Sequence, residues 1–112
     1  MSQVTTHILD TTLGRPAEGV TITLFGIQQD SWQPIGKGIT NRDGRIADLL
    51  DKDVVLPPGA YKMTFETAPY FERTGRKSFY PFVEIVFTID SNEHYHIPLL
   101  LNPFGYTTYR GS

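Results

Sequence analysis

The sequence predicts an all-β sandwich of antiparallel strands. Apolar and polar residues alternate along most of the chain, and Gly, Pro, Asn and Asp interrupt the alternation at short intervals. The 112 residues suffice for one core, so we expect residues 1–112 to form a single domain. About seven or eight strands and one short helix fit this length, which favours two packed sheets.

The first half of the chain contains four predicted strands. Residues 4–10 form the first, and its alternation places His7 on the face opposite the core, together with Thr5 and Leu9. The next strands are expected over residues 20–28 and 32–40. The stretch "NRDGR" then predicts a tight turn, because Asn, Asp and Gly favour its backbone angles. A short strand over residues 45–50 should follow.

The second half predicts the helix and four more strands. After a strand over residues 61–66 comes "TAPYFERTG", where Thr67 can cap a helix, Pro69 suits its first turn and Gly75 can end it. Residues 81–90 alternate most clearly, with inward side chains at Val83, Ile85, Phe87 and Ile89. Residues 94–101 alternate again, and a last short strand is expected over residues 106–111.

Composition argues against several classes of function. The formal net charge is −2 and Lys and Arg are scattered, so we expect no nucleic-acid partner. No apolar run has the length of a membrane span, so no membrane partner is expected. The absence of cysteine excludes thiolate nucleophiles and thiolate metal sites. Neither a signal peptide nor a peroxisomal signal is visible, which favours the cytoplasm and leaves the periplasm open.

The three histidines are the first candidates for chemistry. His7, His94 and His96 all fall opposite the predicted core face, and the two-residue period of a strand points His94 and His96 the same way. A single histidine at such a position is most often a surface residue. Together the three could hold a catalytic zinc ion. Without a metal, a neutral imidazole could act as a general base.

Arg45 and the C-terminal tail add further candidates. A guanidinium at Arg45 could stabilise the negative charge that develops on a carbonyl oxygen during amide hydrolysis; the alternative is a solvated turn residue. The chain ends on Tyr109, Arg110, Gly111 and Ser112, which could bind a polar ring or form only a polar tail. We find no motif for a serine nucleophile or for nucleotide binding.

Five stretches resemble the transthyretin-related proteins that act as 5-hydroxyisourate hydrolase: "THILDTTLGRPAEGV", "TNRDGR", "FYPFVEIVFTI", "HYHIPLLLNPFGY" and "TYRGS". The resemblance covers nearly the whole chain, and the terminal YRGS is its most specific element. Asn102 and Phe104 depart from the family pattern, outside its functional positions. The resemblance implies a transthyretin-like sandwich of eight strands and one short helix, assembled as a homotetramer with its active sites at the dimer-dimer interface.

The resemblance also implies a site and a reaction. Its catalytic residues fall on His7, Arg45, His96 and Ser112, and its substrate-binding residues on His7, Arg45, Tyr109 and Arg110. The reaction is hydrolysis of 5-hydroxyisourate to 2-oxo-4-hydroxy-4-carboxy-5-ureidoimidazoline, between urate and allantoin, with no metal or other cofactor. His94 would be a surface residue or would lie behind the site.

Two alternatives belong to other classes of function. A transthyretin-like carrier would bind a small aromatic molecule in a central channel without catalysis, and a plain structural module would have no pocket. A channel for an apolar ligand is lined mainly by apolar groups, so a polar set of His7, Arg45, His96 and Tyr109 favours the hydrolase.

Overall fold

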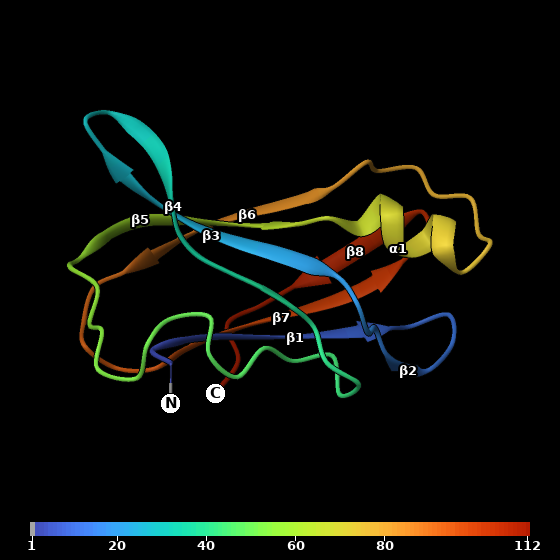
Figure 1. Ribbon diagram of the computed structural model, residues 1–112, viewed down its shortest axis with the longest axis horizontal. Helices are drawn as coiled ribbons and strands as arrows, with labels where there is room; N and C mark the ends of the chain where they lie inside the picture. Colours follow the sequence, from blue (N-terminus) through green and yellow to red (C-terminus); the bar gives the residue numbers. More distant parts are fainter. Residues whose placement is uncertain (1) are drawn as a thin grey trace.

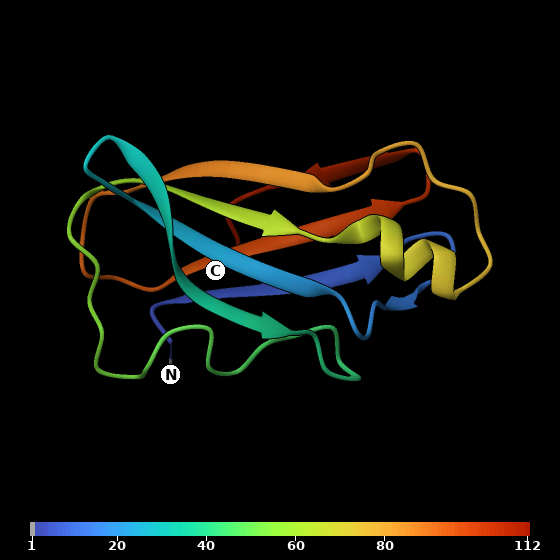
Figure 2. The same ribbon diagram turned by 45° about the horizontal axis from the view of Figure 1, so that its top comes forward.

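The computed structural model describes residues 2–112, which form two four-stranded sheets packed face to face and one helix (Figures 1 and 2). The strand order of one sheet is β2-β1-β7-β8, made of β2 (Arg15–Pro16), β1 (Val4–Asp10), β7 (Tyr95–Asn102) and β8 (Gly105–Thr108). The order of the other is β4-β3-β5-β6, made of β4 (Ser31–Ile39), β3 (Thr21–Gln28), β5 (Gly59–Phe65) and β6 (Val83–Ile89). Helix α1 spans Thr67–Arg73. The predicted sandwich is confirmed.

The pairing of β1 with β7 differs from the antiparallel expectation. These two strands run parallel, with Thr5 opposite His96 and His7 opposite Pro98, whereas the other strand pairs of the two sheets are antiparallel. Alternation within a strand carries no information on the direction of its neighbour, so the sequence did not reveal this. The parallel register decides which residues meet at the site below.

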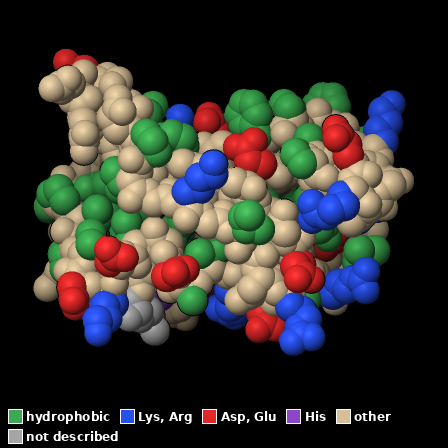
Figure 3. All heavy atoms as spheres, in the orientation of Figure 1, with side chains coloured by type: hydrophobic (Ala, Val, Ile, Leu, Met, Phe, Trp, Pro, Cys, Tyr) green, Lys and Arg blue, Asp and Glu red, His purple; other side chains and the backbone are tan. Residues whose placement is uncertain are grey.

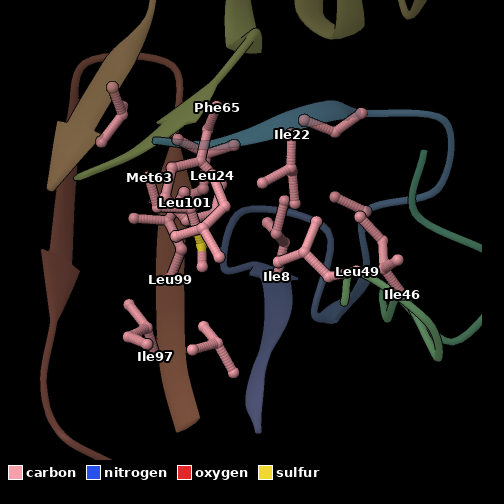
Figure 4. Packing of buried hydrophobic residues seen from close by; sticks show 14 of the residues in the cluster. Ile8, Ile22, Leu24, Ile46, Leu49, Met63, Phe65, Ile97, Leu99 and Leu101 are labelled. Carbon is pink, nitrogen blue, oxygen red and sulfur yellow. The ribbon is translucent and has the colours of Figure 1, made fainter. Parts of the chain in front are cut away.

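The core lies between the two sheets, where the inward side chains of both meet (Figure 4). Side chains of β3 and β5 pack against those of β1 and β7; they include Ile22, Leu24, Met63, Phe65, Ile8, Ile97, Leu99 and Leu101. On β6 the predicted inward side chains are confirmed. Val83 and Ile89 are buried, while Ile85 and Phe87 pack against the core with part of their surface exposed.

Residues 45–50 do not form the predicted strand, and only Arg45 makes an isolated bridge, to His7. The buried side chains here are Ile46, Leu49 and Leu50, whose spacing is not the two-residue period of a strand. The segment lies instead across two glycines of β4. A Cβ at Gly36 would be 2.3 Å from the Leu49 carbonyl oxygen, so the absence of a side chain lets the segment approach.

Helix α1 begins one residue earlier than a Thr67 cap requires, so the prediction that Thr67 caps the helix is wrong. Glu66 is the N-cap residue without a side-chain capping bond, and Thr67 is the first helical residue. The Glu66 N–H donates to the Thr21 carbonyl at 2.9 Å, which extends the sheet contact of β5 to that position. The prediction for Gly75 is confirmed: its φ of 72° lets the Arg76 N–H donate to the Phe71 carbonyl at 2.9 Å and close the helix.

The two ends of the chain lie at one end of the sandwich, and α1 lies at the other (Figures 1 and 2). On the face drawn in Figure 3, acidic and basic side chains are interspersed, with several basic ones at the end that holds α1. Within residues 2–112, no helix has the length and hydropathy needed to cross a bilayer.

Candidate active site

The outer face of the β1-β7 pair brings a threonine and two histidines together. Thr5 on β1 lies opposite His96 on β7, and His94 immediately precedes β7. Thr5 Oγ1 is 2.7 Å from Nε2 of His94 and 2.8 Å from Nδ1 of His96. The imidazole rings of His94 and His96 are stacked, with their centroids 6.3 Å apart. One hydroxyl group therefore lies within hydrogen-bond distance of both imidazole rings.

The "NRDGR" turn places Arg45 beside His7. Asn41 Oδ1 accepts hydrogen bonds from the N–H groups of Asp43 and Arg45, at 2.9 and 3.1 Å. The Gly44 carbonyl accepts a hydrogen bond from the Ile8 N–H at 2.9 Å, which docks the turn on β1. Only glycine suits position 44, because its φ is +74° and a Cβ would be 2.5 Å from the Ile8 carbonyl oxygen. The predicted turn thus holds Arg45 in its bridge with His7.

The C-terminal tail returns to β7 and closes over His96. The Gly111 N–H donates to the His96 carbonyl at 2.8 Å. A Cβ at Gly111 would be 2.7 Å from Cδ2 of the His96 ring and 3.1 Å from Cγ of Pro98. This contact explains a glycine in the terminal sequence: any larger residue would displace either the tail or the imidazole.

A pocket of about 620 Å³ brings three of the predicted catalytic residues together. Its lining consists of Thr5, Thr6, Asn41, Arg45, Ile46, Ala47, His94, His96 and Ser112. His7 does not line this pocket but lies next to it, paired with Arg45 through the backbone. His96, Arg45 and Ser112 come from distant parts of the sequence, so the fold assembles the set.

Within one chain, Tyr109 and Arg110 do not line the pocket that holds Arg45, His96 and Ser112. The Arg110 guanidinium donates to Glu93 Oε1 at 2.6 Å and lies 4.4 Å from the centroid of the Tyr95 ring. Both residues line a second pocket of about 250 Å³, which also contacts β6, β7 and β8. His96 lines both pockets. Within one chain, the two predicted substrate-binding side chains do not join Arg45 and Ser112.

The surroundings of two of the histidines lower their pKa values, which favours the neutral imidazole. The pKa of His96 is lowered, first by burial and then by the positive charge of Arg45 and the neighbouring rings of His94 and His7. The pKa of His7 is lowered by burial and by Arg45, while Asp43 opposes the shift. Arg45 is exposed and takes part in none of the ion pairs formed by residues 2–112. Near neutral pH the site therefore combines proton acceptors with a cation that has no carboxylate partner.

A metal centre made of the three histidines is not assembled. Across the part of the chain that the structure describes, no three His, Asp or Glu side chains are grouped closely enough to hold an ion. The Thr5 hydroxyl bonds to one ring nitrogen of His94 and one of His96. A zinc ion would have to compete with it for those nitrogens.

The sequence had not singled out Thr5 or the contact that Gly111 makes. A signal for Thr5 was present, because it lies two positions before His7 on the same strand face. Its bonds to His94 and His96 depend on the parallel register of β1 and β7, which no local pattern indicates.

These features define a β-sandwich with a polar acid-base pocket on the outer face of one sheet. The family model of the HIUase/Transthyretin family matches residues 4–111, and the chain belongs to that family. The 5-hydroxyisourate hydrolase of Mus musculus is 45% identical over 114 residues, covering 99% of this chain and 96% of the mouse protein.

Solved structures agree with this membership. The 5-hydroxyisourate hydrolase of Klebsiella pneumoniae is 41% identical with a TM-score of 0.84, covering 97% of this chain and 98% of that one. Sea bream transthyretin in complex with thyroxine has a TM-score of 0.91 at 32% identity, covering 98% of this chain and 95% of that one. Backbone similarity thus includes both hydrolase and transthyretin, so the side chains of the site must decide between them.

Proposed function

We propose that the protein hydrolyses 5-hydroxyisourate to 2-oxo-4-hydroxy-4-carboxy-5-ureidoimidazoline, a step between urate and allantoin. The observation that carries this proposal is the single pocket that holds His96, Arg45 and Ser112 together. It is supported by the 45% identity to the mouse 5-hydroxyisourate hydrolase over almost the full length of both chains. An imidazole can act as the general base in hydrolysis of a cyclic amide, and an unpaired guanidinium can stabilise the charge that develops on the carbonyl oxygen.

The proposed reaction opens the N1–C6 amide bond of the substrate. A neutral histidine, His7 or His96, takes a proton from water while the water oxygen bonds to C6. The negative charge moves to the carbonyl oxygen, where Arg45 stabilises it. The C6–N1 bond then breaks, the imidazolium returns its proton to N1, and C6 becomes the carboxyl group. Ser112 and Tyr109 orient the substrate ring, and Arg110 contributes to binding. No resident metal or organic cofactor takes part.

We propose further that residues 1–112 form one domain and that four copies assemble with their active sites at the dimer-dimer interface. The face that carries His7 and His96 also carries Leu9 and Leu100, apolar side chains that a second copy would cover. Tyr109 and Arg110 do not line their own chain's polar pocket, which is consistent with a shared site. Light scattering should give four times the 12.7 kDa chain mass. A cytoplasmic location stays a prediction that cell fractionation would test.

The carrier remains the alternative to test, because the backbone is also similar to that of a thyroxine-bound transthyretin. The large pocket argues against it. Its lining includes two imidazoles, a guanidinium and hydroxyl groups, which can bind and polarise a polar ring and which a carrier of an apolar ligand does not need. A carrier would bind such a ligand and leave 5-hydroxyisourate unchanged.

The deciding experiment is an ultraviolet absorbance trace. Urate oxidase generates 5-hydroxyisourate from urate, the purified protein is added in EDTA, and the decay is compared with the spontaneous rate. Decay well above the blank supports a hydrolase that needs no accessible metal. Decay equal to the blank, both in EDTA and after addition of zinc, would overturn the proposed function and favour the carrier.

A further inference from the structure

One hydroxyl group couples the protonation of two histidines in the pocket. Thr5 Oγ1 contacts Nε2 of His94 at 2.7 Å and Nδ1 of His96 at 2.8 Å. A threonine hydroxyl has a single proton, so it can donate only one of these two bonds and must accept the other. If both rings donated, the hydroxyl proton would need a third acceptor, and Thr5 makes no third side-chain bond within residues 2–112.

Two arrangements satisfy both bonds. In the first, Thr5 donates to Nε2 of His94 and accepts from the Nδ1–H of His96, so Nε2 of His96 carries no proton. In the second, Thr5 donates to Nδ1 of His96 and accepts from His94, so Nε2 of His96 is protonated. Only the first lets His96 take a proton from water, because a neutral imidazole has one free lone pair.

The surroundings of the His96 ring favour the first arrangement. Thr5 occupies the Nδ1 edge, and the tail covers the Cδ2 side so closely that a Cβ at Gly111 would be 2.7 Å away. Neither of these two contacts is made by Nε2, and His96 shares its pocket with Arg45. The cationic guanidinium repels an N–H dipole that points toward it and attracts a lone pair.

We propose that Thr5 and His94 are positioning residues that hold His96 in the tautomer protonated on Nδ1, with Nε2 free as the base that activates water. This inference rests on the proposed function and assigns the base between His7 and His96. When Nε2 takes the water proton, His96 becomes an imidazolium and keeps its Nδ1–H bond to Thr5. It then returns the Nε2 proton to the leaving nitrogen, and no proton has to pass through Thr5.

The tautomer can be observed without substrate. In protein labelled with ¹⁵N-histidine, a long-range ¹H–¹⁵N correlation spectrum distinguishes protonated from unprotonated ring nitrogens. At a pH where His96 is neutral, we expect its Nδ1 to be protonated and its Nε2 to be unprotonated; the reverse would overturn the proposal. An inactive wild-type protein with the expected tautomer would overturn the proposed function alone, so the two failures can be told apart.

Two matched pairs of variants test the catalytic consequence. Thr5→Val keeps the side-chain shape but removes the hydroxyl, so the wrong tautomer of His96 becomes populated and kcat should fall about 10-fold, with KM little changed. Thr5→Ser restores the hydroxyl and should retain most of the rate. His94→Gln can still accept the Thr5 hydrogen bond, whereas His94→Leu cannot, so the leucine variant should lose more.

Two outcomes would overturn the role of Thr5. One is an unchanged kcat in Thr5→Val together with an unchanged ¹⁵N spectrum. The other is a loss in Thr5→Ser as large as that in Thr5→Val, which would indicate packing rather than hydrogen bonding. Thermal unfolding of each variant shows whether it is folded at the assay temperature.

Discussion

Strand β1 contributes to two polar clusters, one on each of its faces. The clusters differ in how many of their hydrogen-bonding groups already have a partner within the protein. On the inner face, Asp10 is fully buried and accepts bonds from Arg76 at 2.6 Å, from Tyr70 at 2.8 Å, and from two backbone N–H groups. On the outer face, His96 is bonded to Thr5 through one ring nitrogen, and Arg45 is absent from the ion pairs of residues 2–112.

The pKa values reflect the same contrast. Burial, the largest single cause, would raise the pKa of Asp10. The hydrogen bonds from Arg76, Tyr70 and the Leu13 N–H, together with the charge of Arg76, outweigh burial, so the pKa is lowered and the charged carboxylate is favoured. In the outer cluster, burial lowers the pKa values of His7 and His96 and nearby Arg45 lowers them further. The inner cluster thus ties β1 to the α1 region, while the outer one keeps donors and acceptors available for a substrate.

The largest expected effect comes from removing either of two side chains of the outer cluster, His96 or Arg45. His96→Ala removes the proposed base and should lower the rate of 5-hydroxyisourate hydrolysis by about 10²- to 10⁴-fold, and Arg45→Ala should lower it by about 10²- to 10³-fold. Arg42→Ala is a matched control, because Arg42 is an exposed arginine of the same turn that lines a different pocket. A near-normal rate in both active-site variants would contradict the proposed roles.

Breaking the inner cluster should change stability instead of chemistry. Arg76→Met leaves the Asp10 carboxylate buried without its cation and should lower the free energy of unfolding by about 3 kcal/mol. The rate per folded molecule should stay unchanged. Arg110→Met is the control, since the Arg110–Glu93 pair is more than half exposed on both sides and its loss should hardly move the unfolding midpoint. Equal denaturation midpoints for the two variants would refute the contrast.

Local patterns predicted the strands well because alternation records which face of each strand is buried. The first strand was predicted with its observed bounds, and the outward position of His7 and His96 followed from the two-residue period. The pattern failed where burial is not periodic, as in residues 45–50, and where the element is very short, as in the two-residue β2.

The partners of the polar residues could not be predicted, because they depend on contacts between distant segments. Asp10 bonds to Tyr70 and Arg76, which lie 60 and 66 positions away, because the fold brings α1 and the residues after it to the end of β1. Thr5 meets His96 only through the parallel register of β1 and β7. The candidate site could thus be named from residue types and the family resemblance, whereas its internal hydrogen bonds required the structure.

A smaller effect is expected from disturbing the wall of the outer cluster. Gly111→Ala places a methyl group against Cδ2 of His96, and a shift of the ring by about 1 Å can cost about 10²-fold in rate. Gly105→Ala is the matched control, because the nearest atom to its added Cβ, on Asn102, is 3.7 Å away. Kinetics with both variants would test the contact. Equal rates in the two variants would show that the C-terminal tail moves to make room for the methyl group and that the imidazole of His96 keeps its position.

The smallest effect concerns the pH dependence of the two clusters. The lowered pKa values of His7 and His96 predict that kcat/KM stays constant above pH 6.5, their ordinary value, and falls only below it as the bases become protonated.

Folding also becomes less favourable below pH 6.5, because the unfolded chain binds protons at these histidines more readily than the folded chain does. The stabilisation that Asp10 contributes persists in this pH range. It begins to be lost only below pH 3.8, the ordinary pKa of an aspartate, and disappears as the pH falls through the lowered pKa of Asp10 in the folded protein. Rates corrected for spontaneous decay, measured beside unfolding curves from about pH 5 to about pH 8, would separate these effects. An acid limb centred above pH 6.5 would mean that the bases are not the buried imidazoles beside Arg45.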